Sequence, residues 1–195
     1  MIKSALQSSL TNDIKYDSMS VGNLPSSEYL IQTVEVGATP IGAITFDVSS
    51  FSGIYKHLQL VMVVRDRNAN SSARTELEFN GSATGYASHE LRSTGSAIGA
   101  ESFTNGSFAR PGRIIGGSGI ANSFSALIVD ILDPFSPNKN TTIKTLGGST
   151  GYNYVYLTSS FWNTTNLVTS IKLQPEAGVA EWAQGSRISL YGVTA

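Results

Sequence analysis

The stretch that decides the fold covers residues 58–64 and has the sequence LQLVMVV. Successive side chains of a β-strand point to opposite faces, so alternate residues share a face. One face of this stretch is entirely apolar and carries Leu58, Leu60, Met62 and Val64. The opposite face holds two more valines, Val61 and Val63. The stretch therefore predicts a strand that is buried on both sides or that turns its second face to a neighbouring subunit.

Strand signals of the same kind recur between Glu28 and Val193. Alternating or nearly continuous apolar runs, bounded mostly by glycine, proline or asparagine, occupy residues 29–36, 44–48, 74–79, 124–132, 152–161, 167–173 and 187–193. No amphipathic helix separates these runs, and parallel sheets need such helices for their crossover connections. We therefore expect an all-β chain of roughly nine or ten strands, folded as an antiparallel two-sheet β-sandwich of the jelly-roll type.

Residues 1–27 differ from the predicted sandwich domain of residues 28–195. They lack strand alternation and end in the turn-forming sequence GNLPSS. Such a segment is either a floppy terminus or a short extended arm that orders on a partner subunit. We predict a docking arm, because apolar side chains that can anchor it are spaced along the segment: Ile2, Leu6, Leu10, Ile14, Tyr16 and Met19.

The stretch from Ser93 to Ala121 is punctuated by glycine and serine and has only scattered apolar residues. We expect a long connection there with one or two short strands. The alternative is a projecting loop that contacts another subunit or a ligand.

Composition narrows the class of protein. Charged residues make up only 14% of the chain, against about a quarter in an average globular domain. The formal net charge is −1 and no basic run occurs, so we expect no nucleic-acid partner. The absence of cysteine excludes disulfides and cysteine-type zinc sites. The apolar runs are too short for a signal peptide or a membrane span, and we expect neither.

The motifs of catalysis are missing from the sequence. His57 and His89 lie far apart and in no metal-ligand spacing. The sequence GGSGI at residues 116–120 lacks the final glycine of a nucleophile elbow, and GGSTG at 147–151 lacks the lysine of a phosphate-binding loop. We therefore expect a protein that is not an enzyme and that uses no metal or cofactor.

Aromatic residues offer the main indication of binding. Tyr152, Tyr154 and Tyr156 alternate along one predicted strand, and Trp162 and Trp182 follow. Such rings stack on sugars, which makes these five residues candidates for contact with a glycan or with another subunit. The alternative is that they pack in the core.

Several segments in order carry a resemblance to a known group of proteins. They are FDVS at 46–49, YKHLQL at 55–60, FNG at 79–81, IVDILDP at 128–134, TSIKL at 169–173 and GSRISLYGV at 185–193. Over residues 40–193 the chain resembles a widespread group of tailed-bacteriophage virion proteins that carry a jelly-roll-like β-sandwich. The segment GSRISLYGV is the most specific part of the resemblance.

The resemblance implies a place in a virion and no reaction. We therefore expect a non-enzymatic virion structural protein that decorates or stabilises the phage particle through its N-terminal arm and through subunit contacts. Its partners would be other capsid or tail- and portal-associated proteins, and the chain itself would form a homo-oligomer, a trimer. The alternative function is a tail- or fibre-associated module that binds a host surface glycan.

Overall fold

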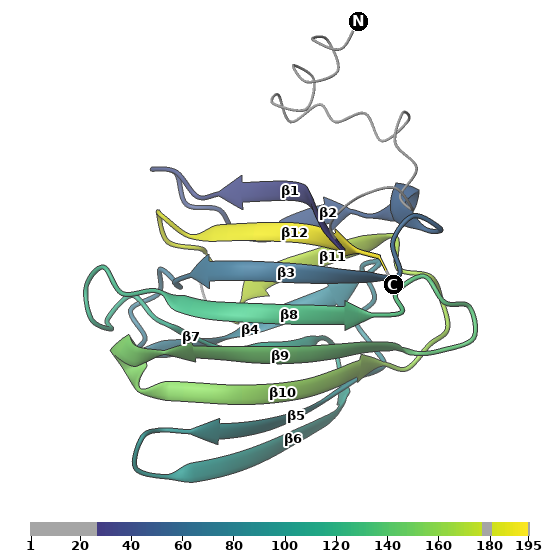
Figure 1. Cartoon of the computed structure of the whole chain (residues 1–195). Coiled ribbons are helices and arrows are strands. Elements are labelled where there is room, and N and C mark those ends of the chain that lie inside the picture. The colour runs from purple at the N-terminus through teal and green to yellow at the C-terminus, as the bar shows by residue number, and fades with distance from the viewer. Residues whose placement is uncertain (1–26, 177–180, 195) are drawn as a thin grey trace, which may run out of the picture.

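The computed structural model describes residues 27–176 and 181–194, and these residues form twelve strands in two antiparallel sheets (Figure 1). The larger sheet has the order β1 (Glu28–Glu35), β12 (Arg187–Val193), β3 (His57–Val64), β8 (Ser125–Leu132), β9 (Thr141–Ser149), β10 (Tyr154–Trp162), β5 (Tyr86–Ser93) and β6 (Ile98–Gly106). The smaller sheet has the order β2 (Ile44–Asp47), β11 (Ser170–Pro175), β4 (Ser72–Phe79) and β7 (Ala109–Ile115). The helices of the described part are two short 3-10 turns, Ser49–Phe51 and Thr150–Tyr152, and neither could span a membrane.

Eight of the strands have jelly-roll topology. In the larger sheet β1, β12, β3 and β8 are neighbours, and in the smaller sheet β2, β11, β4 and β7 are neighbours. Among these eight strands the chain crosses between the sheets from β1 to β2, to β3 and to β4, and again from β7 to β8, from β8 to β11 and from β11 to β12. Two four-stranded sheets connected in this order form a jelly roll. The predicted fold class is therefore confirmed.

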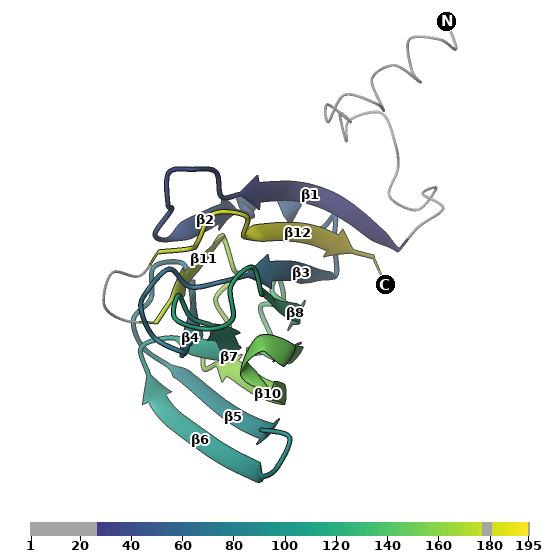
Figure 2. The same cartoon turned by 90° about the vertical axis from the view of Figure 1, so that its left-hand side faces the viewer.

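Two inserted hairpins enlarge one sheet only. The hairpin β5–β6 follows β4, the hairpin β9–β10 follows β8, and both extend the larger sheet beyond β8. Figure 2 shows the two sheets facing each other, with β5 and β6 continuing the larger one past the smaller. The stretch from Ser93 to Ala121 therefore holds β6 and β7, of nine and seven residues. Most of it is strand, where the sequence predicted mainly a connection.

The core lies between the two sheets. The predicted apolar face of β3 points into it, and Leu58, Leu60, Met62 and Val64 are each at most 1% exposed. The second face of β3 is different, because Val63 is 38% exposed and Val61 is half-buried. Of the two alternatives for residues 58–64, burial of both faces within the chain is therefore wrong. The other alternative, contact with a neighbouring subunit, stays a prediction.

A network of ion pairs joins the β5–β6 hairpin to the smaller sheet. Glu101 on β6 is paired with Arg74 of β4 (2.6 Å), with Arg113 of β7 (3.4 Å) and with Arg92 of β5. Glu90 on β5 is also paired with Arg113, at 3.3 Å. Partial burial acts to raise the pKa of Glu101, but the hydrogen bonds and charges of Arg74 and Arg92 outweigh it and leave that pKa below its ordinary value.

We expect Glu101→Gln to lower the free energy of unfolding at pH 7 by about 1–2 kcal/mol, because the carboxylate that bridges three arginines is lost. A lowered pKa contributes stability above the pKa of the unfolded state, and the contribution disappears as pH falls through the folded pKa. The difference between wild type and variant should therefore be largest near neutral pH and shrink below the ordinary glutamate range. Urea unfolding across that pH range checks it, and a difference independent of pH would contradict the ion-pair role.

Candidate interaction surface

The surface with the clearest functional potential is the outer face of the larger sheet, the face turned away from the smaller sheet. The strand register places six apolar residues directly opposite one another from strand to strand across this face. We call this row the apolar ladder; in order from β3 to β6 it consists of Val61, Ile128, Leu146, Leu157, Leu91 and Ala100.

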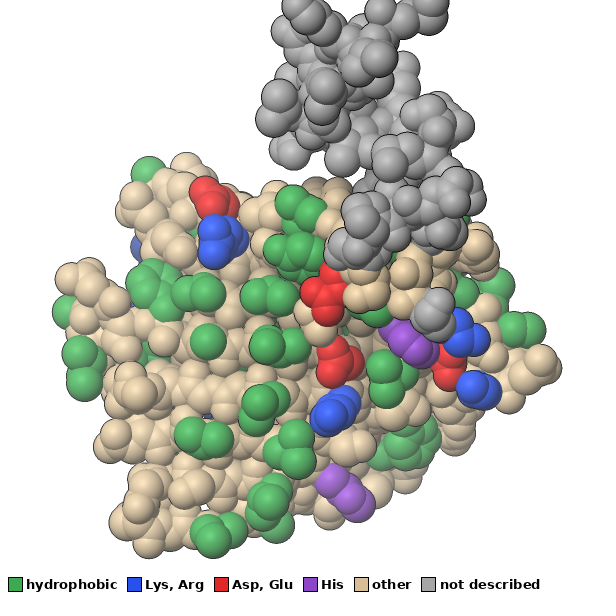
Figure 3. Space-filling view, viewed as in Figure 1, with side chains coloured by type: hydrophobic (Ala, Val, Ile, Leu, Met, Phe, Trp, Pro, Cys, Tyr) green, Lys and Arg blue, Asp and Glu red, His purple; other side chains and the backbone are tan. Residues whose placement is uncertain are grey.

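The apolar ladder is exposed. Ile128 and Leu157 are each 45% exposed, Leu91 is 53% exposed and Leu146 is 57% exposed. A second row beside it is also largely apolar and contains Val63, Ala126, Gly148, Val155, Ser93 and Ile98. Figure 3 shows hydrophobic side chains spread over this face. Isolated exposed apolar residues are normal on a protein surface, but a contiguous set indicates a contact surface.

A polar row lies on the other side of the apolar ladder. It consists of Gln59, Asp130, Lys144, Ser159, His89 and Ser102. Gln59 donates a hydrogen bond of 2.8 Å to Asp130, so the one acidic residue in the apolar run 124–132 has the partner that its position requires. Asp130 and Lys144 also stand opposite each other on neighbouring strands, a favourable cross-strand pairing. The outer face thus combines an apolar centre with a neutral polar border.

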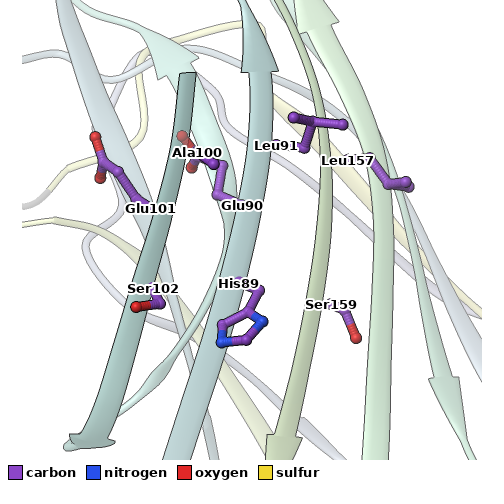
Figure 4. A pocket seen from close by; sticks show the side chains of 8 residues that line it. All are labelled: His89, Glu90, Leu91, Ala100, Glu101, Ser102, Leu157 and Ser159. Atoms are coloured by element: carbon purple, nitrogen blue, oxygen red, sulfur yellow. The ribbon is translucent and has the colours of Figure 1, made fainter. Parts of the chain in front are cut away.

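The outer face is hollowed at its β5–β6 end. A shallow depression of about 420 Å³ lies between β6, β5 and β10 (Figure 4). Its apolar side is lined by Leu91, Ala100 and Leu157, and its polar side by His89, Ser102 and Ser159. Glu90 and Glu101 also border it, but their carboxylates belong to the ion-pair network on the opposite side of the sheet. The depression is open and carries no charged group of that network.

The aromatic residues singled out from the sequence do not form a common platform. Tyr156 is 1% exposed, Trp162 is 4% exposed and Trp182 is fully buried, and all three belong to the core. Only Tyr152 and Tyr154 reach the surface, half-buried, with ring centroids 4.7 Å apart. The alternative of core packing therefore holds for three of the five residues, and those three rings are not available to stack on a sugar.

Glycines remote in sequence explain the burial of Tyr156. A β-carbon on Gly112 of β7 would collide with the Tyr156 ring, and one on Gly147 of β9 would lie 2.5 Å from its hydroxyl oxygen. The ring thus occupies space that only glycine leaves free. Burial raises the pKa of Tyr156, which keeps the phenol neutral. The sequence alone could not link these residues, because Gly112 and Tyr156 lie on different sheets.

The remaining residues considered in the sequence are the two histidines and the six predicted anchors of the N-terminal arm. His57 and His89 lie on β3 and β5, and the Nδ1 atom of His57 accepts a 3.0 Å hydrogen bond from the backbone N–H of Asp133. Within residues 27–176 and 181–194, no three His, Asp or Glu side chains are placed to hold a metal ion. The predicted anchors Ile2, Leu6, Leu10, Ile14, Tyr16 and Met19 lie outside the described residues.

The fold and the surface together define a jelly-roll β-sandwich with one enlarged sheet whose outer face is partly apolar. Comparisons with known protein families, curated proteins and solved structures found no match for this chain.

Proposed function

We propose that this chain is a non-enzymatic structural protein of a phage particle, where it decorates or stabilises the particle through surface contacts. The observation that carries the proposal is the apolar ladder, a contiguous row of apolar side chains exposed on a regular sheet. Such a surface is suited to contact with another protein surface. The resemblance to tailed-bacteriophage virion proteins with a jelly-roll-like sandwich supports the same proposal.

The proposal assigns attachment to residues 1–27. Strand β1 begins at Glu28 and pairs with β12, so each of the twelve described strands has a partner among residues 27–176 and 181–194. The apolar anchors predicted between Ile2 and Met19 would bind a neighbouring capsid or tail-associated protein.

We expect deletion of residues 2–24 to abolish attachment to the particle and to leave a folded sandwich. The measurement is the copy number of the chain on purified particles, together with the thermal unfolding of the free truncated protein. The matched control is the full chain added to the same particles. Truncated protein that joins particles at full occupancy would show that the arm is not the docking element.

A cryo-EM map of the phage particle tests where in the particle this chain lies. Copies repeated across the shell, with residues 1–27 against a neighbouring protein, are expected for a decoration role. A few copies at the tail or at a fibre tip would instead favour the receptor-binding alternative, and absence of the chain from the particle would refute the structural role.

A further inference from the structure

We propose that the outer face of the larger sheet packs against the same face of a second copy of this chain, in a two-fold symmetric dimer centred on the apolar ladder. The inference goes beyond the proposed function, because it concerns a contact between two copies and does not require a particle. It rests on the size of the face, on the symmetry of the apolar ladder and on the side chains that this symmetry brings together.

The size of the face suits a stable contact. The six strands that carry the apolar ladder measure about 29 Å across, and strands of eight residues are about 27 Å long, so the face covers roughly 780 Å². A standard protein interface buries about 800 Å² on each partner. The apolar ladder and the second row, which contains Val155, form the centre of the face. The polar row, which contains Asp130 and Lys144, forms its border. An apolar centre with a polar rim is the usual anatomy of such interfaces.

The apolar ladder is symmetric about a line between β9 and β10. A two-fold axis along that line, parallel to the strands, places β9 over β10 of the second copy, β8 over β5 and β3 over β6. Leu146 then faces Leu157 of the second copy, and Ile128 faces Leu91.

The same axis matches the flanking rows. Val155, which is 61% exposed, faces Gly148, where no side chain competes for the space. In the polar row Asp130 faces His89 of the second copy and Lys144 faces Ser159, so these two charged residues do not meet a like charge. Ile128 of one copy lies over the depression of the other, beside Leu91 and Leu157.

A two-fold symmetric contact of this type produces a dimer and leaves no free copy of the same patch to bind a third subunit. When one surface patch binds the same patch on a second subunit, the interface is isologous and gives a dimer. The trimer expected from the sequence would need two different patches that bind each other. The apolar ladder is a single patch, and it therefore favours a dimer.

The test is the mass of the full chain in solution, measured by sedimentation or light scattering with Leu146→Asp and with Ile120→Asp as the control. Ile120 is 65% exposed but lies in the loop after β7, off the outer face. We expect wild type and the control to be dimers. We expect Leu146→Asp to dissociate, with a dimer affinity at least about 100-fold weaker. The variant should remain folded, and its melting temperature should fall only by the stabilisation that dimerisation gives the wild type. A wild-type monomer or trimer, or a dimer that Leu146→Asp leaves intact, would overturn the proposal.

A second measurement does not depend on a disruptive variant. Because the chain has no cysteine, Val155→Cys introduces a single thiol near the axis, about 11 Å from its copy on the facing sheet. A short bismaleimide reagent should link this variant into dimers and leave Ile120→Cys mostly monomeric. Equal linking of the two variants would show that another surface forms the dimer.

Discussion

Replacing Trp182 by alanine should lower the free energy of unfolding by about 3–5 kcal/mol, the range measured when a large aromatic side chain is removed from a core. Trp182 is fully buried and is the largest of the fully buried side chains. The backbone N–H of Trp182 donates a 2.7 Å hydrogen bond to the carbonyl oxygen of Ile41. The backbone of Trp182 also forms isolated antiparallel β-bridges with Ile41 and with Asp66. Trp182 therefore connects the segment before β12 to the residues around Ile41 and Asp66.

Trp182→Phe is the matched control for this prediction. Phenylalanine keeps an aromatic ring and most of the buried apolar surface, so we expect a clearly smaller loss than with alanine. Urea unfolding of both variants measures the difference. If Trp182→Ala unfolded at the wild-type urea concentration and lost only binding to a glycan, Trp182 would be a surface residue and the burial described above would be wrong.

The jelly roll could be predicted because its strands carry strong local signals. Alternation in residues 58–64 identifies which side chains enter the core, and the structure buries Leu58, Leu60, Met62 and Val64. In residues 167–173 the alternation is right for Ile171 and Leu173, which are buried, and wrong for Leu167, which is 39% exposed. Of the inserted strands, β5, β6 and β9 gave weaker signals. Strand β6 has the sequence IGAESFTNG, and its residues are exposed or half-buried along its whole length. Where neither face of a strand is deeply buried, no apolar alternation is required, and the pattern that identifies a strand is lost.

The candidate surface could not be predicted for a related reason. The apolar ladder consists of single residues from six strands, such as Leu91, Leu146 and Leu157. Each of them is an ordinary exposed leucine in its own segment. They form one surface only because the register of the larger sheet aligns them, and register is a property of strand pairing that the linear sequence does not display.

The two interpretations of the aromatic residues could not be separated from the sequence, because the residue type fits both; three of the five residues pack in the core. Tyrosine and tryptophan are favoured both in binding sites and in large cores. Trp162 stacks on Tyr86 with ring centroids 6.0 Å apart, inside the core. Nothing in the sequence near Trp162 distinguishes that position from an exposed one.

Arg65 joins two irregular segments at the same end of the sandwich, the loop between β7 and β8 and the residues that precede β12. It is 9% exposed, and its guanidinium donates hydrogen bonds to four carbonyl oxygens of the loop between β7 and β8, those of Gly117, Gly119, Ile120 and Ser123. Its own carbonyl accepts a 2.9 Å hydrogen bond from the N–H of Ala183. One side chain thus supplies the donors that a strand partner would supply elsewhere.

We expect Arg65→Met to lower the free energy of unfolding by about 3 kcal/mol or more, because methionine keeps the apolar stem and leaves four carbonyl oxygens without their charged donor. Arg65→Lys retains the charge but not the planar fork that reaches all four oxygens, so its loss should be intermediate. Hydrogen exchange separates this role from general packing. Backbone amides from Gly116 to Ser123 should lose protection in Arg65→Met before those of β3 do. Equal protection of that loop in wild type and variant would mean that Arg65 does not hold it.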